Sequence, residues 1–176
     1  MFLTATLPLL LMQQAPAGDI DWDKEFGVEE VERDPVTGEI PVEPYTKSNA
    51  NAGATPFNSD AMAAHFGGRD GIERIADRFT DLNFADPRIG GIFAGHDEVR
   101  FRRTIFEQFC YILNAGCDYT GRDMQSSHAG LGSRKADLNA IVENLQQAMR
   151  EENVPFAAQN RFLSKLAPMS GDVIER

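Results

Sequence analysis

A histidine among small residues is the first candidate for chemistry in this chain. His128 stands in the stretch MQSSHAGLGS, residues 124–133, and is one of three histidines. Glycine and serine at this density predict a loop or a frayed helix rather than a long helix. A lone histidine is most often a surface residue or a hydrogen-bonded core residue, and this reading stays open. An imidazole can also act as an acid, a base or a metal ligand, so the surrounding residues must discriminate.

Two common histidine chemistries lack the residues that they need. No serine or cysteine stands in a recognisable nucleophile elbow, and the chain has neither an HExxH nor a CxxC motif for zinc. Haem iron needs less, because the porphyrin supplies four nitrogens and one axial imidazole in an apolar cage completes the site. Phenylalanines that could form such a cage are Phe79, Phe84, Phe93, Phe101, Phe106 and Phe109. An aromatic helical core needs no cofactor, so this pattern permits haem without requiring it.

The domain that must position His128 is predicted to be all-α. Apolar residues recur at three- and four-residue spacing in the stretches 72–82, 99–113, 138–149 and 156–169. The expected boundaries are Gly67-Gly68 before the first stretch, Asp86-Pro87 after it, Asp97 as the N-cap of the second, and Asn114 to Gly116 as its stop. No segment alternates with period two for long enough to predict a strand. We expect four longer helices with short helical pieces between them, and His128 lies in the unsettled stretch 117–133.

Composition predicts one folded domain with an N-terminal extension. The chain has 176 residues, of which 42% are hydrophobic, enough for one core. Residues 18–58 are acidic, contain prolines and end in a Ser/Asn/Ala-rich piece, so we expect a disordered extension and linker before a domain at 59–176. The net charge of −10 excludes the basic surface that nucleic acids require.

The first residues resemble a secretory signal. An apolar run is followed by Ala15-Pro16-Ala17, which predicts a signal peptide over residues 1–17, although no Lys or Arg precedes the run. The run is too short to span a bilayer. The expected location is periplasmic or secreted if the signal is real, and cytoplasmic otherwise.

Two further patterns predict little chemistry. Cys110 and Cys117 would lie roughly 10 Å apart along one face of a continuous helix, too far for a disulfide, so we expect small buried hydrophobes. Residues 19–30 place carboxylates at positions one, three, five and twelve of a calcium-binding EF-hand loop. Lys24 occupies the sixth position, where the turn needs glycine, and an acidic tail produces such matches by chance.

Several motifs agree together in order and spacing with one known family. They are Phe66-Gly67-Gly68, Phe79, the stretch 85–95 (ADPRIGGIFAG), the stretch 119–124 (YTGRDM) and the stretch 128–132 (HAGLG). Over roughly residues 60 to 172 the chain resembles a truncated hemoglobin of the first group, the bacterial and protozoan type. The resemblance implies a two-over-two helical sandwich with a short proximal segment in place of a full helix. It also implies one haem b per chain, with His128 as the proximal iron ligand.

The same resemblance assigns roles around the haem. Phe93 would pack on the haem face, and Tyr119, Thr120 and Met124 would line the proximal side or approach a propionate. The family often offers a cation to the propionates at the positions of Arg100, Arg102 and Arg103. Of these, Arg103 is expected to contact the haem. For each arginine, a place on a solvated face of the helix is an equally good alternative. The complete set of implied haem contacts is Phe79, Phe93, Phe101, Arg103, Ile105, Tyr119, Thr120 and Met124.

The distal side departs from the family pattern. Members of this group commonly carry a tyrosine and a glutamine that donate hydrogen bonds to bound oxygen; here these positions fall on Thr80 and Ile105, with Phe101 beside them. Each lost donor should cost about 1–2 kcal/mol, tenfold or more in affinity. We therefore expect an apolar distal pocket with one hydroxyl at most, fast oxygen dissociation and weak discrimination against carbon monoxide. His65 and His96 are expected at the surface, and a role of either as a sixth iron ligand is the alternative.

The resulting hypothesis is a haem-binding globin for the diatomic gases O2, CO and NO. Oxygen transport or storage, gas sensing, nitric oxide dioxygenase activity and peroxidase-like turnover stay open, and the last two would involve a reductase or other redox partner. The alternative from a different class is a haem-free sensor or adaptor module that kept the globin fold. Binding of added haemin discriminates between the two hypotheses.

Overall fold

The computed structural model describes residues 31–176, and Arg33–Arg176 forms one compact unit. The signal peptide expected over residues 1–17 and the EF-hand-like stretch 19–30 lie outside the described residues, so both stay predictions. No helix among the described residues is long and apolar enough to cross a membrane.

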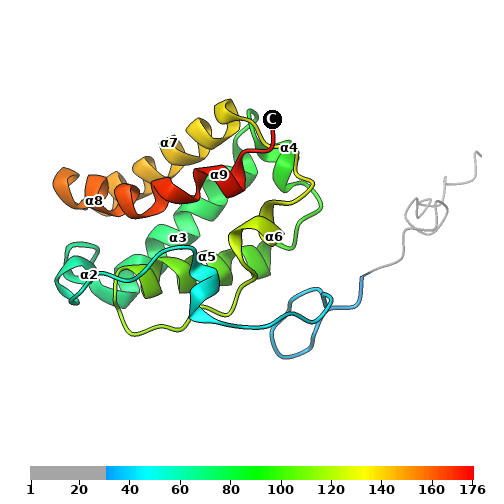
Figure 1. Cartoon of the computed structure of the whole chain (residues 1–176), viewed down its shortest axis with the longest axis horizontal. Coiled ribbons are helices and arrows are strands. Elements are labelled where there is room, and N and C mark those ends of the chain that lie inside the picture. Colours follow the sequence, from blue (N-terminus) through cyan, green and yellow to red (C-terminus); the bar gives the residue numbers. More distant parts are fainter. Residues whose placement is uncertain (1–30) are drawn as a thin grey trace, which may run out of the picture. The chain divides into compact units, whose positions relative to one another are not determined.

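The described chain is helical throughout, as the sequence pattern predicted (Figure 1). Its elements, in order, are η1 (Asn49–Ala52), α2 (Ala61–His65), α3 (Gly68–Ala85), α4 (Gly90–Phe93), α5 (Glu98–Ile112), α6 (Met124–His128), α7 (Lys135–Glu151), α8 (Phe156–Leu166), η2 (Ala167–Met169) and α9 (Ser170–Val173). The four apolar stretches correspond to the long helices α3, α5, α7 and α8. Within residues 31–176 no strand forms.

Local sequence explains where the helices begin and end. Gly67 and Gly68 precede the body of α3 with φ angles of +77° and +67°, a backbone region that costs glycine little. Asp97 precedes α5 as expected, but its carboxylate does not cap that helix. It accepts hydrogen bonds instead from the Ile40 N–H at 2.7 Å and from the Arg33 guanidinium at 2.8 Å. The Asp97 carboxylate therefore binds the segment around Arg33 and Ile40 to the start of α5.

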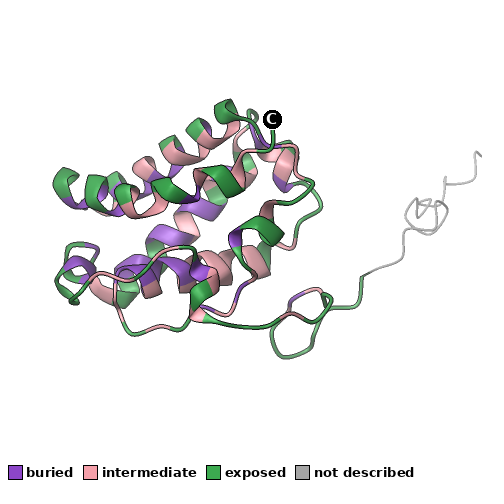
Figure 2. Cartoon of the chain, viewed as in Figure 1, coloured by how far each residue is buried: buried purple, intermediate pink, exposed green. Residues whose placement is uncertain are grey.

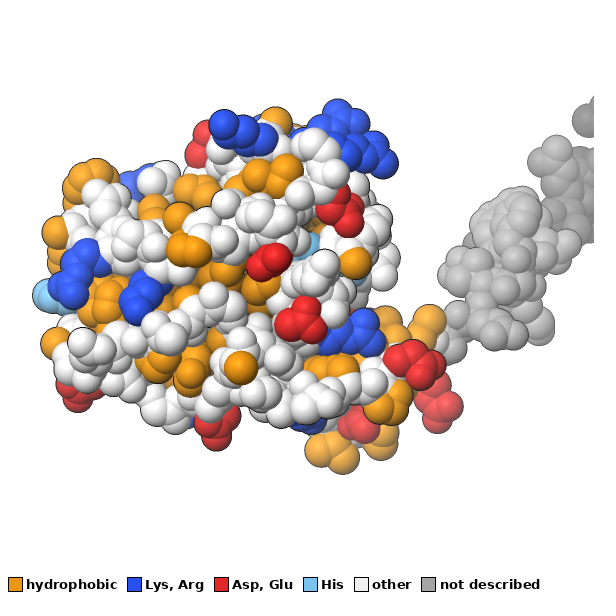
Figure 3. All heavy atoms as spheres, viewed as in Figure 1, with side chains coloured by type: hydrophobic (Ala, Val, Ile, Leu, Met, Phe, Trp, Pro, Cys, Tyr) orange, Lys and Arg blue, Asp and Glu red, His pale blue; other side chains and the backbone are white. Residues whose placement is uncertain are grey.

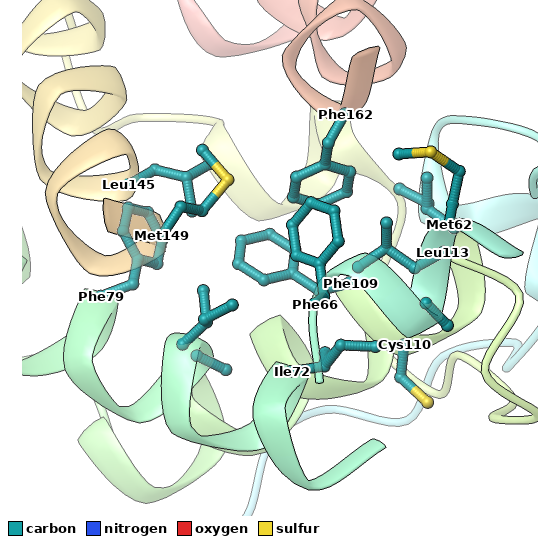
Figure 4. Packing of buried hydrophobic residues seen from close by; sticks show 14 of the residues in the cluster. Met62, Phe66, Ile72, Phe79, Phe109, Cys110, Leu113, Leu145, Met149 and Phe162 are labelled. Atoms are coloured by element: carbon teal, nitrogen blue, oxygen red, sulfur yellow. The ribbon is translucent and has the colours of Figure 1, made fainter. Parts of the chain in front are cut away.

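The long helices pack around α3. α3 contacts α5 on one side and α7 on another, and α7 and α8 form the second pair of helices (Figure 1). The positions that face between the helices are buried (Figure 2). Phe162 of α8 meets Phe66 and Phe109 edge to face, with ring centroids 5.3 and 5.1 Å apart (Figure 4). Such pairs add about 0.5–1.5 kcal/mol each to the burial of apolar area.

The two cysteines form a disulfide, which corrects the prediction made from their spacing. The Cα atoms of Cys110 and Cys117 are 5.6 Å apart. α5 ends at Ile112, and Asn114 and Gly116 then adopt φ angles of +60° and +82° that reverse the chain. The prediction was wrong because it carried a straight helix across the predicted stop.

Residues 33–58 belong to the compact unit, although their composition indicated a disordered extension and linker. Glu39 is buried among arginines of α5, so its charge is compensated rather than solvated. The Tyr45 hydroxyl donates to the Thr120 carbonyl at 2.9 Å, and Ala52 is fully buried. The compact unit of the structure thus begins at Arg33, because contacts distant in sequence order a segment that composition alone would not; the domain bounds of 59–176 stay a prediction.

Candidate functional site

Two adjoining lobes of one cavity open between α3, α5, α6 and α7. The larger lobe, of about 570 Å³, extends toward α8, and the smaller, of about 190 Å³, toward α4. Seven residues line both lobes: Phe79, Ile105, Gln108, Met124, His128, Ile141 and Val173. Figure 3 shows hydrophobic side chains lining a hollow that crosses this face of the domain. A mostly apolar cavity of this size with a few polar groups is typical of a cofactor site.

His128 ends the short helix α6 and borders both lobes. Asp123 caps this helix by accepting a hydrogen bond from the Ser126 N–H at 2.8 Å. His128 Nδ1 lies 2.7 Å from the carbonyl oxygen of Met124. A carbonyl only accepts, so Nδ1 carries the proton of the neutral imidazole and Nε2 keeps a free lone pair. The geometry therefore prepares Nε2 as a metal ligand, since an imidazole ligand ordinarily donates its other N–H to a partner of this kind.

The loop after His128 is held by Glu175, which follows α9 (Ser170–Val173). Glu175 accepts hydrogen bonds from the N–H groups of Gly130, at 2.6 Å, and Gly132. These two backbone hydrogen bonds lower the pKa of Glu175. The Glu175 N–H in turn donates to the Ser133 carbonyl at 2.9 Å. The glycine-rich segment is thus held by hydrogen bonds to Glu175.

Three phenylalanines, Phe79, Phe93 and Phe101, form the aromatic wall of the smaller lobe, and Phe84 packs against two of them. Phe93 of α4 and Phe101 of α5 have ring centroids 5.3 Å apart, and Phe84 lies 5.3 Å from Phe93. Phe79 of α3 stacks on Phe101 at 6.5 Å. The wall combines residues from three helices, so any flat apolar group in the lobe would meet ring faces and edges rather than water.

The structure brings most of the sequence-predicted site residues to this cavity. Those that line it are Phe79, Phe93, Phe101, Ile105, Tyr119, Met124 and His128. Burial raises the pKa of Tyr119, whose hydroxyl donates to the Arg122 carbonyl at 2.9 Å. Tyr119 therefore contributes its ring to the cavity and uses its hydroxyl to fix the turn before α6.

Three predicted residues do not line the cavity. Thr80 is fully buried, but its hydroxyl donates to the Ala76 carbonyl at 2.8 Å within the same helix. Arg103 pairs with Glu39 and Glu107, and it also bonds the Thr120 hydroxyl. These side chains form a polar cluster that anchors the segment before the helices to α5. Partners elsewhere in the chain thus occupy the polar atoms of Thr80, Arg103 and Thr120.

Two buried amide side chains that the sequence analysis did not single out border the cavity. Gln108 Nε2 donates to the Ala52 carbonyl at 2.9 Å and lies 3.3 Å from the Met124 sulfur. Asn83 of α3 lines the smaller lobe and is fully buried. Its position, four residues after Phe79, places it on the cavity face of α3, and this spacing was the signal that could have identified it.

A third cavity, of about 430 Å³, adjoins the smaller lobe and carries cations at its edge. Arg100 and Arg122 line it together with Thr104 and Tyr119. Arg100 donates to the Ile40 carbonyl at 2.7 Å, but its Nε is buried without a hydrogen-bond partner among the described residues. Arg122 stacks on the Tyr45 ring. This edge cavity therefore places two guanidinium groups, with the Asp97 carboxylate also in its lining, at the boundary of an otherwise apolar site.

Comparisons with known proteins agree with this arrangement. A family model described as bacterial-like globin matches residues 62–175. The group 1 truncated hemoglobin GlbN of Nostoc commune is 26% identical over 112 residues, which cover 64% of this chain and 95% of that protein. The group 1 truncated hemoglobin LI410 of Chlamydomonas moewusii is 28% identical over 120 residues, 65% of this chain and 70% of that protein.

Solved structures give the same fold. The truncated hemoglobin of Tetrahymena pyriformis in its Fe(III) form superposes with a TM-score of 0.62 at 21% identity, covering 65% of this chain and 98% of that one. The 2/2 hemoglobin of Synechococcus sp. PCC 7002, solved in the cyanomet state with covalently attached heme, gives a TM-score of 0.60 at 21% identity with the same coverage. The predicted two-over-two helical fold is confirmed.

Proposed function

The chain belongs to the bacterial-like globin family, among the truncated hemoglobins, and from this premise we propose that it binds one haem b through His128. Haem, when bound, would supply an iron that can bind a diatomic gas, and the His128 imidazole would hold that iron. The observation that carries the proposal is the hydrogen bond from His128 Nδ1 to the Met124 carbonyl, which leaves Nε2 as a free ligand at the cavity.

The residues around the cavity suit a haem. The aromatic wall and the apolar residues of both lobes exclude water from a large flat ring. Carboxylates such as the haem propionates need cations, and the edge cavity provides Arg100 and Arg122. The unpartnered Nε of Arg100 supports this placement, because a buried donor is rarely left without an acceptor. Arg100 thereby takes the role that the resemblance gave to Arg103, whose hydrogen bonds are already used.

The proposed ligands are the diatomic gases O2, CO and NO. Oxygen transport or storage, gas sensing and a redox role toward nitric oxide or peroxide are the possible uses, and a redox role would require a reductase or other electron donor. The mostly apolar lining of the smaller lobe favours reversible binding over turnover, because only a few of its side chains, His96 among them, could move a proton during a reaction.

A haemin titration of the purified full chain tests the proposal. We expect a stoichiometric Soret band in the ferric form and a sharp carbon monoxide band after reduction. His128→Ala should lose or displace both bands, whereas the matched variant His65→Ala should keep them, since His65 is exposed and borders neither lobe. A native protein that binds no haemin would overturn the proposal and favour the haem-free adaptor.

We also propose that the chain functions in an oxidising compartment. The Cys110–Cys117 disulfide supports this location, because disulfides persist mainly in the periplasm and outside cells. The signal peptide expected over residues 1–17 would direct the chain there. Fractionation of cells that express the chain with and without residues 1–17 tests the point; recovery of both forms in the cytoplasm would contradict it.

A further inference from the structure

Asn83 presents an unused hydrogen-bond donor at the smaller lobe of the cavity. The side chain is fully buried, and its Nδ2 has no hydrogen-bond partner among the described residues. Three other buried polar side chains line the same lobe, Gln108, Tyr119 and Ser133, and each of them donates to an acceptor within the protein. Of these four buried side chains, Asn83 is therefore the one whose donor has no partner among the described residues.

A chain of hydrogen bonds fixes which end of the Asn83 amide is free. Arg88 holds the pKa of Asp86 far below its usual range, so Asp86 stays ionised and can only accept. Asn144 Nδ2 lies 3.2 Å from an Asp86 carboxylate oxygen, and the same nitrogen lies 3.0 Å from Asn83 Oδ1.

This order leaves no ambiguity between the oxygen and the nitrogen of Asn83. If the Asn83 amide were turned over, its nitrogen would face the nitrogen of Asn144, two donors without an acceptor. If the Asn144 amide were turned over instead, its oxygen would face the Asp86 carboxylate, two acceptors without a donor. Asn83 Oδ1 is thus committed to α7, and Nδ2 is the end that stays unused.

The surroundings of this donor are aromatic and apolar. Phe79 lies one helical turn before Asn83 on α3, and Phe93, Phe101 and Ile105 line the same lobe. His128 approaches from a different helix, α6. A buried donor left without a partner costs free energy, so an acceptor that enters the lobe would gain more from it than from a donor in water.

We propose that Asn83 Nδ2 donates a hydrogen bond to the outer atom of the gas ligand and is the residue that sets the preference for dioxygen over carbon monoxide. The inference rests on the proposed haem function. Dioxygen bound in a haem protein carries partial negative charge and accepts a hydrogen bond, whereas carbon monoxide carries much less. Asn83 would then supply the donor that Thr80, bonded within its own helix, does not supply.

The test compares oxygen and carbon monoxide dissociation in the haemin-loaded, reduced full chain. Asn83→Leu removes the donor with little change in volume. Asn83→Leu combined with Asn144→Leu removes both amides, so that no polar atom of this pair is left unpartnered if the single variant folds poorly. Thr80→Val is the matched control, because it also makes a buried position of α3 apolar.

The expected result is oxygen dissociation about tenfold faster in both Asn83 variants, with carbon monoxide dissociation changed by less than about twofold. The stretching frequency of bound carbon monoxide should rise in the same variants and stay unchanged in Thr80→Val. Native oxygen dissociation rates in both Asn83 variants of a protein that binds haemin would overturn this inference and leave the haem function standing. A native chain that takes up no haemin would overturn both.

Discussion

Glu175 accepts a hydrogen bond from the N–H of Gly130, 2.6 Å away, and so joins the C-terminal residues to the loop that follows His128. The Gly132 N–H makes a second hydrogen bond to the same carboxylate. Gly130 and Gly132 both have positive φ angles, of +81° and +64°, so the loop depends on glycine to present its N–H groups in this way.

This contact predicts an acid-sensitive loop. Because the folded state lowers the pKa of Glu175, its stabilising contribution is complete above the carboxyl's ordinary pKa of 4.5 and is lost as the pH falls below it. Glu175→Gln should lower the thermal midpoint of the haem-free protein at neutral pH, and its difference from the native protein should shrink below about pH 4.

Asp172→Asn is the control, since this neighbouring carboxylate of α9 is exposed and forms no ion pair with a described residue. It should leave the midpoint unchanged at neutral pH. A Glu175→Gln difference that stays constant from pH 7 to pH 3 would show that the carboxylate contributes nothing through its charge.

Thr80, which the resemblance assigns to the distal side, should have little influence on the ligand. Its hydroxyl is used by Ala76 one turn earlier, so we expect Thr80→Val to change oxygen dissociation by less than about twofold. The free energy of unfolding should change by no more than about 1 kcal/mol, because valine keeps the shape and the lost hydrogen bond lies within the helix. Denaturant unfolding and stopped-flow kinetics measure the two effects; oxygen loss tenfold faster would assign the donor role to Thr80.

The disulfide should stabilise the turn that leads into Tyr119. It closes a loop with a sequence separation of seven, for which constraint of the unfolded chain is worth about 2 kcal/mol. Cys110→Ser with Cys117→Ser should lower the thermal midpoint by about 4–8 °C. Reduction of the native protein should produce a similar decrease and should leave the double variant unaffected. Equal midpoints for oxidised and reduced native protein would contradict the prediction.

The sequence was most informative where a local pattern decides the structure. Apolar spacing identified α3, α5 and α7, and the order of the motifs identified the family. The stretch around His128 was expected to be a loop or a frayed helix, and the structure shows the short helix α6 ending at His128. The disulfide was missed although the stop at Asn114 to Gly116 had been predicted. That stop lies between the two cysteines, so the straight-helix distance should not have been applied to them.

Contacts between distant residues could not be predicted from the sequence. In the sequence, Asn83 is only a polar residue close to an apolar stripe. Its role depends on Asn144, 61 residues later, whose side-chain nitrogen donates a hydrogen bond to Asn83 Oδ1. Likewise, the composition around Glu39 indicates disorder until α5 supplies arginines to neutralise it. In both cases a polar atom acquires its role from a tertiary partner, and periodicity carries no information about such partners.

Substitutions of Arg100 and Arg103 should have different effects, the first on haem binding and the second on anchoring of the N-terminal segment. Both pair with Glu39, but only Arg100 lines the edge cavity and has an unpartnered Nε. Arg100→Met should therefore weaken haemin binding by about tenfold, the worth of a hydrogen bond to a charged group. Arg103→Met should change haemin binding by less than about threefold.

The free energy of unfolding should decrease more in Arg103→Met than in Arg100→Met. Arg103 makes the closer contact with the buried Glu39 carboxylate and also bonds Glu107, so its loss leaves a poorly solvated charge. We expect Arg103→Met to reduce the free energy of unfolding by about 1–2 kcal/mol, less than for a fully buried pair because Arg103 is partly exposed. Haemin titration and urea unfolding of the two variants provide the comparison. A larger loss of haemin affinity in Arg103→Met would restore Arg103 as the propionate contact, since its ion pairs would then have to open when haem binds.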